Sequence, residues 1–269
     1  MNFTLLGSGF IMPRHAEAIY ALGGKILDVV NTAHGEDRWM SAVTDPKADC
    51  VVILAPNDLH VPMARLAAEH GKRVLCEKPL GIDAASVRTL LPFDHIFTVL
   101  QLHHHPLVQE LKRQVEGGGR FDVDMNISVY RDAKYFLSWK GDAKRSGGVL
   151  FNLGIHYFDL LRHVFGEPTR LETTSLDDRV GTGVIEGERY RCTWTVGVYG
   201  DRADQQRRFL VNGKDYNFSS QDNLSFENLH RRVYQDLLEG RGVLPAQALE
   251  SVELVERLYA HEAAATYAA

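Results

Sequence analysis

The feature that most constrains the fold is an alternation of short apolar runs with helix-length segments over the first hundred residues. The apolar runs lie at residues 3–6, 25–31, 50–55, 73–76 and 96–102. Two segments between them, residues 13–22 and 61–70, have the length and spacing of helices. Strands that alternate with helices form parallel sheets, and the unbroken apolar run at 50–54 suits a strand that is covered on both faces. We therefore predict a doubly wound α/β domain over residues 1–105.

The pattern changes after residue 105. A period-two run at residues 191–198 places alternate side chains on one face of a strand. Asn212-Gly213 predicts a two-residue hairpin turn between 209–211 and 216–218, because both turn positions need positive φ. The other elements expected there are a strand at 121–130 and helices at 107–115, 155–165, 227–238 and 246–263. We predict that residues 106–269 form an α+β domain with a largely antiparallel, open sheet.

The composition is that of a globular protein and limits its partners. With 269 residues, 45% hydrophobic and 24% charged, the chain has room for one large domain or two modest ones and is not of a disordered class. Its 30 Lys and Arg against 35 Asp and Glu give a net charge of −5, which disfavours nucleic acid or an anionic membrane as a partner. Three widely spaced cysteines favour a reducing compartment. Without a secretory leader pattern or an 18-residue apolar window, we expect a soluble, cytoplasmic protein.

A glycine-rich turn follows the first apolar run. In Gly7-Ser8-Gly9, unblocked backbone N–H groups just before a helix favour a pyrophosphate, as in Rossmann-type domains. An ordinary tight turn is the alternative, because Met12 stands where the usual third glycine would be. Asn31 ends the second run, where an acidic residue commonly holds a ribose, so the choice between NAD and NADP stays open. Since the next helix-like piece, 38–43, follows closely, we expect the Rossmann-type sheet to be abbreviated after its second strand.

A lysine stands at the end of the fourth apolar run, in Glu77-Lys78-Pro79. The carboxyl ends of strands are where open α/β sheets bind ligands. A lysine there can hydrogen-bond a substrate hydroxyl or, with its pKa lowered by burial, take part in proton transfer. An exposed lysine without such a role is the alternative.

A polar triplet lies within the apolar helix expected at 155–165 and the residues before it. Asn152, His156 and Asp159 are four and three residues apart, so a helix brings them to one face. Polar groups in so apolar a segment need buried partners or a binding site, and an imidazole suits acid–base work near neutral pH. The alternative is a core histidine bonded to Asp159.

Four motifs together resemble one family. They are Gly7-Ser8-Gly9, Ala55-Pro56-Asn57-Asp58-Leu59-His60, Cys76-Glu77-Lys78-Pro79 and Asn152-Leu153-Gly154-Ile155-His156. In this order and spacing the chain resembles the Gfo/Idh/MocA oxidoreductases over nearly its whole length. Residues 100–105 and 138–142 are most similar to bacterial dehydrogenases of UDP-2-acetamido-2-deoxy-glucuronate, which oxidise the 3-hydroxyl of the sugar. The resemblance implies NAD-dependent oxidation of a sugar hydroxyl in surface-polysaccharide biosynthesis, with NADP also open.

The resemblance also implies a role for each matching residue. Lys78 and His156 are the expected catalytic pair at the sugar hydroxyl. The residues expected to bind the cofactor are Gly7, Gly9, Phe10, Ile11, Asn31, Pro56, Asn57, His60, Glu77, Trp139 and Lys140. The expected substrate contacts are Gln101, Asn152 and Asp159, and Asp159 also occupies a position that can orient the histidine. Pairing of the C-terminal sheets into a homodimer or homotetramer is expected as well.

Two alternatives concern metals and catalysis. The run His103-His104-His105 does not predict a metal site, because successive side chains of an extended segment point to opposite faces and no cysteine is near; we expect no metal. The alternative function is that of a non-catalytic sugar- or nucleotide-binding homologue. It is left open because the cofactor-binding pattern of the family is altered at Met12 and Asn31 and shortened after Asn31. Retention of both Lys78 and His156 argues against it.

Overall fold

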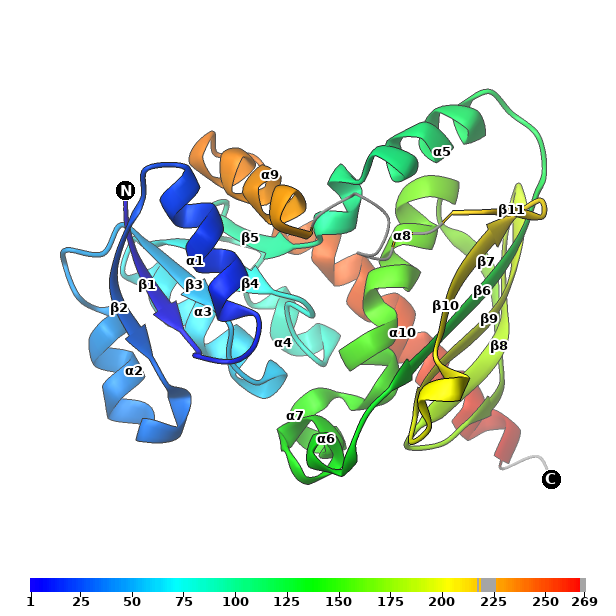
Figure 1. The fold of residues 1–269 in the computed structure, drawn as a ribbon, viewed down its shortest axis with the longest axis horizontal. Coiled ribbons are helices and arrows are strands. Elements are labelled where there is room, and N and C mark those ends of the chain that lie inside the picture. Colours follow the sequence, from blue (N-terminus) through cyan, green and yellow to red (C-terminus); the bar gives the residue numbers. More distant parts are fainter. Residues whose placement is uncertain (217, 219–225, 267–269) are drawn as a thin grey trace. The chain divides into compact units, whose positions relative to one another are not determined.

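The computed structural model describes residues 1–216, 218 and 226–266 and divides into two compact units (Figure 1). Unit 1 comprises residues 1–101 and 225–250, and Unit 2 comprises residues 102–224 and 251–269. One change of unit lies close to the expected boundary at residue 105. The return of residues 225–250 to Unit 1 was not expected, because an amphipathic pattern does not say which core its apolar face covers.

Unit 1 contains a five-stranded parallel sheet with the order β2-β1-β3-β4-β5. Its strands are β1 (Asn2–Leu6), β2 (Lys25–Val30), β3 (Cys50–Ile53), β4 (Arg73–Glu77) and β5 (Ile96–Val99). All four residues of β3 are buried, as an unbroken apolar run requires. The neighbours of β1 are β2 on one side and β3 on the other, so the strand order reverses there, which is where such sheets bind ligands. The predicted parallel α/β sheet is confirmed.

The helices of Unit 1 are α1 (Met12–Ala21), α2 (Glu36–Val43), α3 (His60–Glu69), α4 (Ala84–Arg88) and α9 (Phe226–Leu238). The expected shortening after Asn31 takes the form of a 3-10 turn, Thr32–His34, and an eight-residue α2 that leads to β3. Helix α9 lies beside α1 (Figure 1). Its Val233, Tyr234 and Leu237 belong to the same apolar core as Phe3 of β1, which explains why this late segment joins Unit 1.

Unit 2 contains a six-stranded sheet with the order β11-β10-β6-β9-β8-β7. The strands are β6 (Phe121–Tyr130), β7 (Pro168–Leu176), β8 (Val180–Gly187), β9 (Tyr190–Tyr199), β10 (Gln206–Val211) and β11 (Lys214–Asp215). Only the β6–β9 pair is parallel among the described strand pairs of this sheet, which confirms the largely antiparallel prediction. Cys192, Trp194 and Val196 of β9 are buried on one face, as their period-two spacing predicted.

The helices of Unit 2 are α5 (Pro106–Glu116), α6 (Ala133–Leu137), α7 (Ala143–Ser146), α8 (Ile155–Phe165) and most of α10 (Pro245–Thr266). The predicted turn forms, with positive φ at Asn212 and Gly213. Its second arm is β11 rather than 216–218, because pairing starts directly after the two-residue turn; residue 217 lies outside the described part of the chain.

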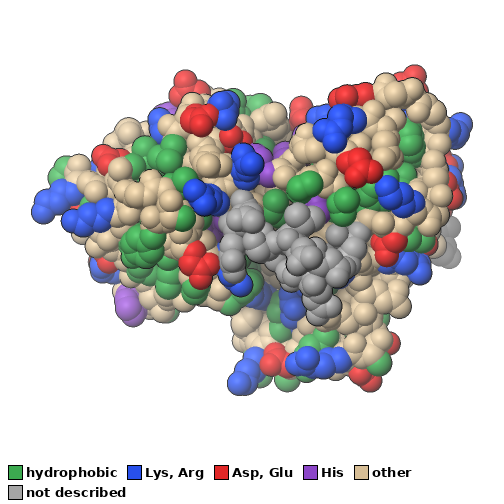
Figure 2. All heavy atoms as spheres, turned by 45° about the horizontal axis from the view of Figure 1, so that its top comes forward, with side chains coloured by type: hydrophobic (Ala, Val, Ile, Leu, Met, Phe, Trp, Pro, Cys, Tyr) green, Lys and Arg blue, Asp and Glu red, His purple; other side chains and the backbone are tan. Residues whose placement is uncertain are grey.

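Two surface properties bear on partners. No helix among the described residues is long and apolar enough to cross a membrane. On the face that Figure 2 shows, basic and acidic side chains are interspersed, in agreement with the small net charge of −5.

Candidate functional site

The glycine-rich turn after β1 has the backbone that a pyrophosphate site needs. Gly7 has φ 123°, and a Cβ there would collide with the backbone carbonyl of Leu54, so only glycine fits. A Cβ at Gly9, in contrast, would meet nothing within 4 Å, which leaves that side of the turn open. Helix α1 begins after Ile11, whose side chain does not cap it. The N–H groups of Met12 and Arg14 are bonded to backbone carbonyls and Pro13 has no N–H, so the part of this segment suited to an anion is the backbone of the glycine turn itself.

The residues after β2 form the second part of the predicted cofactor site. Asn31 is exposed, and its Oδ1 accepts a hydrogen bond of 2.9 Å from the backbone N–H of Ala33. This bond holds the 3-10 turn, so the group that Asn31 offers to a ribose is its amide N–H donor. Nearby, Arg38 pairs with Asp28 at 2.6 Å, and this exposed pair adds no net charge.

His60 fastens two loops at the carboxyl ends of β3 and β4. Its Nδ1 lies 2.6 Å from the carbonyl oxygen of Pro79, and its Nε2 lies 2.9 Å from that of Ala55. A neutral imidazole donates one such bond, and only the imidazolium donates both. Burial lowers the pKa of His60, against the two carbonyl bonds, which raise it. The ring is fully buried and links the two loops; cofactor contact by His60, Pro56 and Asn57 stays a prediction.

Lys78 directly follows Glu77, the last residue of β4, and is half-buried. The Glu77 carboxylate accepts a bond of 3.2 Å from the backbone N–H of Lys78 and one of 3.0 Å from Nε2 of His15. The hydroxyl of Tyr234 lies 2.9 Å from the other ring nitrogen of His15, and Nε2 of His230 lies 3.9 Å from Glu77. The predicted catalytic lysine is therefore next to a buried polar cluster that sequence reasoning missed. The only signal of that cluster was a histidine on the apolar side of α1.

Burial and bonding act in opposite directions on Glu77. Burial raises the pKa of the carboxyl, but the bond to His15 and the nearby ring of His230 outweigh it and hold the pKa well below its usual range. Donor atoms of Glu77, His15 and His230 all lie within 4.8 Å of one another, which is close enough for the three to share a metal ion. Two imidazoles and a carboxylate suit zinc, so the expectation that no metal binds stays a prediction.

In Unit 2, the other predicted catalytic residue begins a helix. His156 is half-buried in the first turn of α8 and follows a π-helical turn, Leu150–Gly154, a rare geometry that is frequent at functional sites. Asn152 lies in that turn, and its amide donates a 2.5 Å bond to the hydroxyl of Tyr135.

Two cationic side chains lie near the ring of Tyr135. Arg131 lies 5.4 Å and Lys140 lies 6.0 Å from the ring centroid, and Lys140 is also 5.7 Å from the ring of Trp139. Burial lowers the pKa of both cations. Half-buried cations beside an amide form a setting suited to an anionic ligand, and Trp139 and Lys140 were both predicted site residues.

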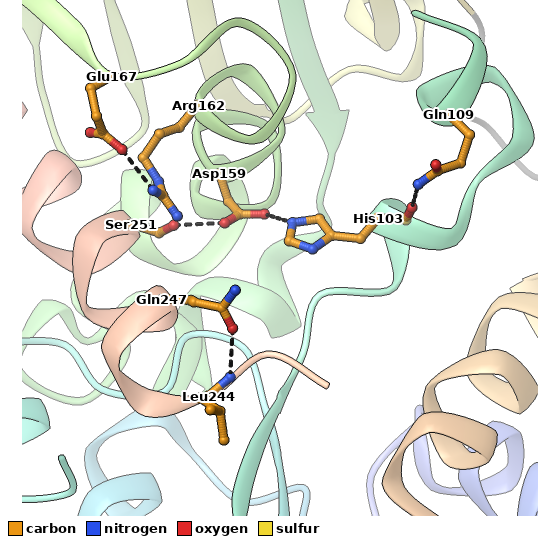
Figure 3. Close-up of polar contacts among 8 residues, drawn as sticks. All are labelled: His103, Gln109, Asp159, Arg162, Glu167, Leu244, Gln247 and Ser251. Carbon is orange, nitrogen blue, oxygen red and sulfur yellow. Dashed lines mark hydrogen bonds and ion pairs between the residues drawn. The ribbon is translucent and has the colours of Figure 1, made fainter. Parts of the chain in front are cut away.

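Asp159 is bonded to a different histidine from the expected one (Figure 3). Its Oδ2 lies 2.6 Å from Nε2 of His103, and its Oδ1 accepts a 2.7 Å bond from the hydroxyl of Ser251. The ring that Asp159 orients is thus that of His103, not His156, because a residue outside the helix approaches the buried carboxylate. The ring of His163 stacks on that of His103 at 3.8 Å. A substrate contact by Asp159 stays a prediction, since both its oxygens have protein partners.

The remaining predicted residues are placed as follows. Phe10 is 79% exposed beside the glycine turn. Gln101 is buried, and its side-chain oxygen has no hydrogen-bond partner within the described residues, which fits a group that waits for a ligand. The structure gathers the glycine turn, Asn31, His60, Lys78 and Gln101 in Unit 1, and gathers Trp139, Lys140, Asn152 and His156 in Unit 2.

Comparison with known proteins identifies the family. The family model described as "Oxidoreductase family, NAD-binding Rossmann fold" matches residues 1–92. The model described as "Oxidoreductase family, C-terminal alpha/beta domain" matches residues 112–181. The chain belongs to the Gfo/Idh/MocA oxidoreductase family. Members of this family are NAD(P)-dependent dehydrogenases that act on CH–OH groups, so the resemblance of the motifs is confirmed.

Individual relatives cover different shares of the chain. Inositol 2-dehydrogenase of Rhizobium meliloti is 28% identical over 67% of this chain and 61% of its own length. Levoglucosan dehydrogenase of Pseudarthrobacter phenanthrenivorans is 29% identical over 62% of this chain, which spans about half (52%) of that relative.

Two solved structures match nearly the whole chain. Both are of the WlbA (WbpB) dehydrogenase from Thermus thermophilus, at 28% identity. The complex with NAD and alpha-ketoglutarate covers 96% of this chain and 94% of its own, with a TM-score of 0.84. The complex with NAD and UDP-GlcNAcA covers 95% and 93%, with a TM-score of 0.82.

Proposed function

We propose that this protein is an NAD-dependent dehydrogenase that oxidises the 3-hydroxyl of UDP-GlcNAcA, the UDP-linked N-acetylated glucuronic acid. The observation that carries the proposal is the likeness, over 95% of the chain and at 28% identity, to a dehydrogenase structure that holds NAD and UDP-GlcNAcA. Supporting it are the motif residues Lys78, Asn152 and His156, all present in this chain. The proposal includes a cytoplasmic role in surface-polysaccharide biosynthesis and a homodimer or homotetramer formed through the sheet of Unit 2.

The chain's own residues manage a proton in this reaction. Bound NAD would supply the hydride acceptor. Oxidation of the alcohol to a ketone removes a hydride from carbon 3 and a proton from its hydroxyl. One of Lys78 and His156 accepts that proton, while the other hydrogen-bonds the sugar oxygen and fixes its position. Both groups are half-buried, which limits the water that competes for the same proton.

Other residues divide the work of binding. The turn that contains Gly7 and Gly9 receives the pyrophosphate, with Phe10 and Ile11 beside it, and Asn31 donates to the ribose. Pro56, Asn57 and His60 line the nicotinamide side, and Glu77 helps to hold that end. Trp139 and Lys140 contact the cofactor, and the charge of Lys140 and its neighbour Arg131 also suits the sugar carboxylate or diphosphate. Gln101 and Asn152 supply hydrogen bonds.

A comparison of two nucleotide sugars tests the proposal. The purified protein is first titrated with NAD, NADH, NADP and NADPH in a thermal-shift assay, since a ligand at a hundred times its Kd stabilises the fold by about 2.7 kcal/mol. The protein and the preferred cofactor are then given UDP-GlcNAcA or UDP-GlcNAc, which lacks the carboxylate. We expect the 3-keto product from UDP-GlcNAcA and at least tenfold less from UDP-GlcNAc. No thermal shift with any cofactor, or no product from either sugar, refutes the proposal.

A further inference from the structure

We infer that His15, His230 and Tyr234 form a buried clamp on Glu77 and that this clamp fixes the backbone turn carrying Lys78. The inference deepens the proposed function and rests on it, because it assigns positioning residues to the proposed catalytic lysine. The three clamp residues come from α1 and α9, far from Glu77 in sequence, and all lie in Unit 1.

The contacts form a continuous chain from α9 to the lysine. The Tyr234 hydroxyl lies 2.9 Å from Nδ1 of His15, and Nε2 of His15 lies 3.0 Å from Oε1 of Glu77. The other carboxylate oxygen, Oε2, accepts the backbone N–H of Lys78 at 3.2 Å. The ring of His230 packs edge-on against that of His15 at 4.9 Å and points its Nε2 to within 3.9 Å of Glu77. A displacement of the clamp side chains of α1 or α9 therefore moves the Glu77 carboxylate, and with it the backbone of Lys78.

Protonation of the clamp follows from its burial. His15, His230 and Tyr234 are essentially inaccessible to water, and the Glu77 side chain is 13% exposed. Burial lowers the pKa of His15 and so favours the neutral ring, which has one donor. The Tyr234 hydroxyl then donates to Nδ1, and Nε2–H donates to Glu77. This order leaves one buried negative charge, on Glu77, that hydrogen bonds stabilise.

The same donors are the ones that converge as a possible metal site, but the bonding pattern favours the clamp. The separation of 3.0 Å between His15 and Glu77 is that of a direct hydrogen bond. The second oxygen of Glu77 is bonded to the lysine backbone, and the second nitrogen of His15 is bonded to Tyr234.

The test compares apolar and polar replacements of the clamp. The variants are Glu77→Gln, His15→Phe, His15→Gln, His230→Phe, His230→Gln and Tyr234→Phe, with Lys78→Ala as the reference. The exposed His70, which directly follows α3, gives a matched control, His70→Gln. For each protein, kcat and KM for UDP-GlcNAcA, the Kd for NAD, the melting temperature and the zinc content are measured.

We expect His15→Phe and Glu77→Gln to lower kcat by about 10²-fold, the cost of misplacing a reacting group by about 1 Å. KM for the sugar stays within about threefold of wild type, because the sugar-binding groups of Unit 2 are unchanged. His15→Gln and His230→Gln, which keep an N–H donor, recover most of the activity that the phenylalanine variants lose. A purely structural role would lower the melting temperature and the two kinetic constants together, without this recovery.

Two results overturn the inference, and both differ from failure of the proposed function. If Lys78→Ala is inactive but Glu77→Gln, which keeps the shape of the side chain, turns over like wild type, the clamp has no part in positioning. If the purified protein retains one zinc per chain and His230→Phe loses it, the donors serve an ion instead. If wild type has no turnover, or Lys78→Ala retains full turnover, it is the proposed function that fails.

Discussion

The stacked pair of His103 and His163 predicts a specific loss of stability in mild acid. His163 lies half-buried on α8. Burial, with the nearby charges of His103, Lys112 and Arg162, lowers its pKa to about 4 in the folded protein, from an ordinary value of 6.5. Between these two values the unfolded chain binds a proton that the folded chain does not. The contribution of His163 to the free energy of unfolding is therefore fully present above pH 6.5 and is lost as the pH falls toward 4.

The magnitude follows from the size of the shift. A shift of one pKa unit corresponds to 1.36 kcal/mol. Without screening by solvent, the shift of His163 would therefore lower the free energy of unfolding by about 2 kcal/mol at pH 5. Because part of the ring is exposed to screening by solvent, we expect about 1 kcal/mol. In His163→Phe, which keeps a ring to stack on His103, this contribution disappears.

Urea denaturation at pH 7 and pH 5 measures the effect. The loss of unfolding free energy between the two pH values should be about 1 kcal/mol smaller in His163→Phe than in wild type, with unchanged m-values. His70→Gln, at an exposed site, should match wild type. Equal losses in His163→Phe and wild type would refute the reasoning, because other groups would then account for the acid sensitivity.

Three further predictions concern the cofactor and the reaction. Lys78→Ala and His156→Ala should each lower turnover of UDP-GlcNAcA by about 10² or more, and near-normal turnover in both would remove their assigned roles. Gly7→Ala should cost about 2 kcal/mol or more, because its φ of 123° and the carbonyl of Leu54 exclude a Cβ; chemical denaturation measures this, and an unchanged midpoint contradicts it. Asn31→Asp should favour NAD over NADP by about a further tenfold, since a carboxylate accepts from the ribose hydroxyls and repels a 2′-phosphate. Calorimetric titration tests it, and an unchanged ratio would place the ribose elsewhere.

Local patterns were sufficient to predict most elements of the fold. The run at 50–54 became the fully buried β3, and the apolar segment at 155–165 became α8 with the same limits. Such elements are set by their own side-chain periodicity, which the sequence displays directly. The place of α9 in Unit 1 was not predictable in this way, because its apolar face fits either core and tertiary packing made the choice.

The residues of the candidate site likewise fall into those that local patterns predict and those that they do not. Motif residues such as Lys78 and His156 were found because their chemistry and spacing are local. The partners of Glu77 and Asp159 were missed: His15 and His230 approach Glu77 from α1 and α9, and His103 was set aside with its two neighbours. Which polar groups meet inside a protein depends on contacts between distant segments, and a histidine in isolation gives no sign of its partner.

Transfer of a labelled hydride tests the central claim most directly. The protein is incubated with its cofactor and UDP-GlcNAcA that carries deuterium at carbon 3, and the nucleotides are analysed by mass spectrometry after denaturation, so that reduced cofactor held in place is also detected. The account predicts deuterium in the reduced nicotinamide, a 3-keto sugar product, and loss of both in His156→Ala. Binding of NAD without deuterium transfer from this sugar would contradict the account.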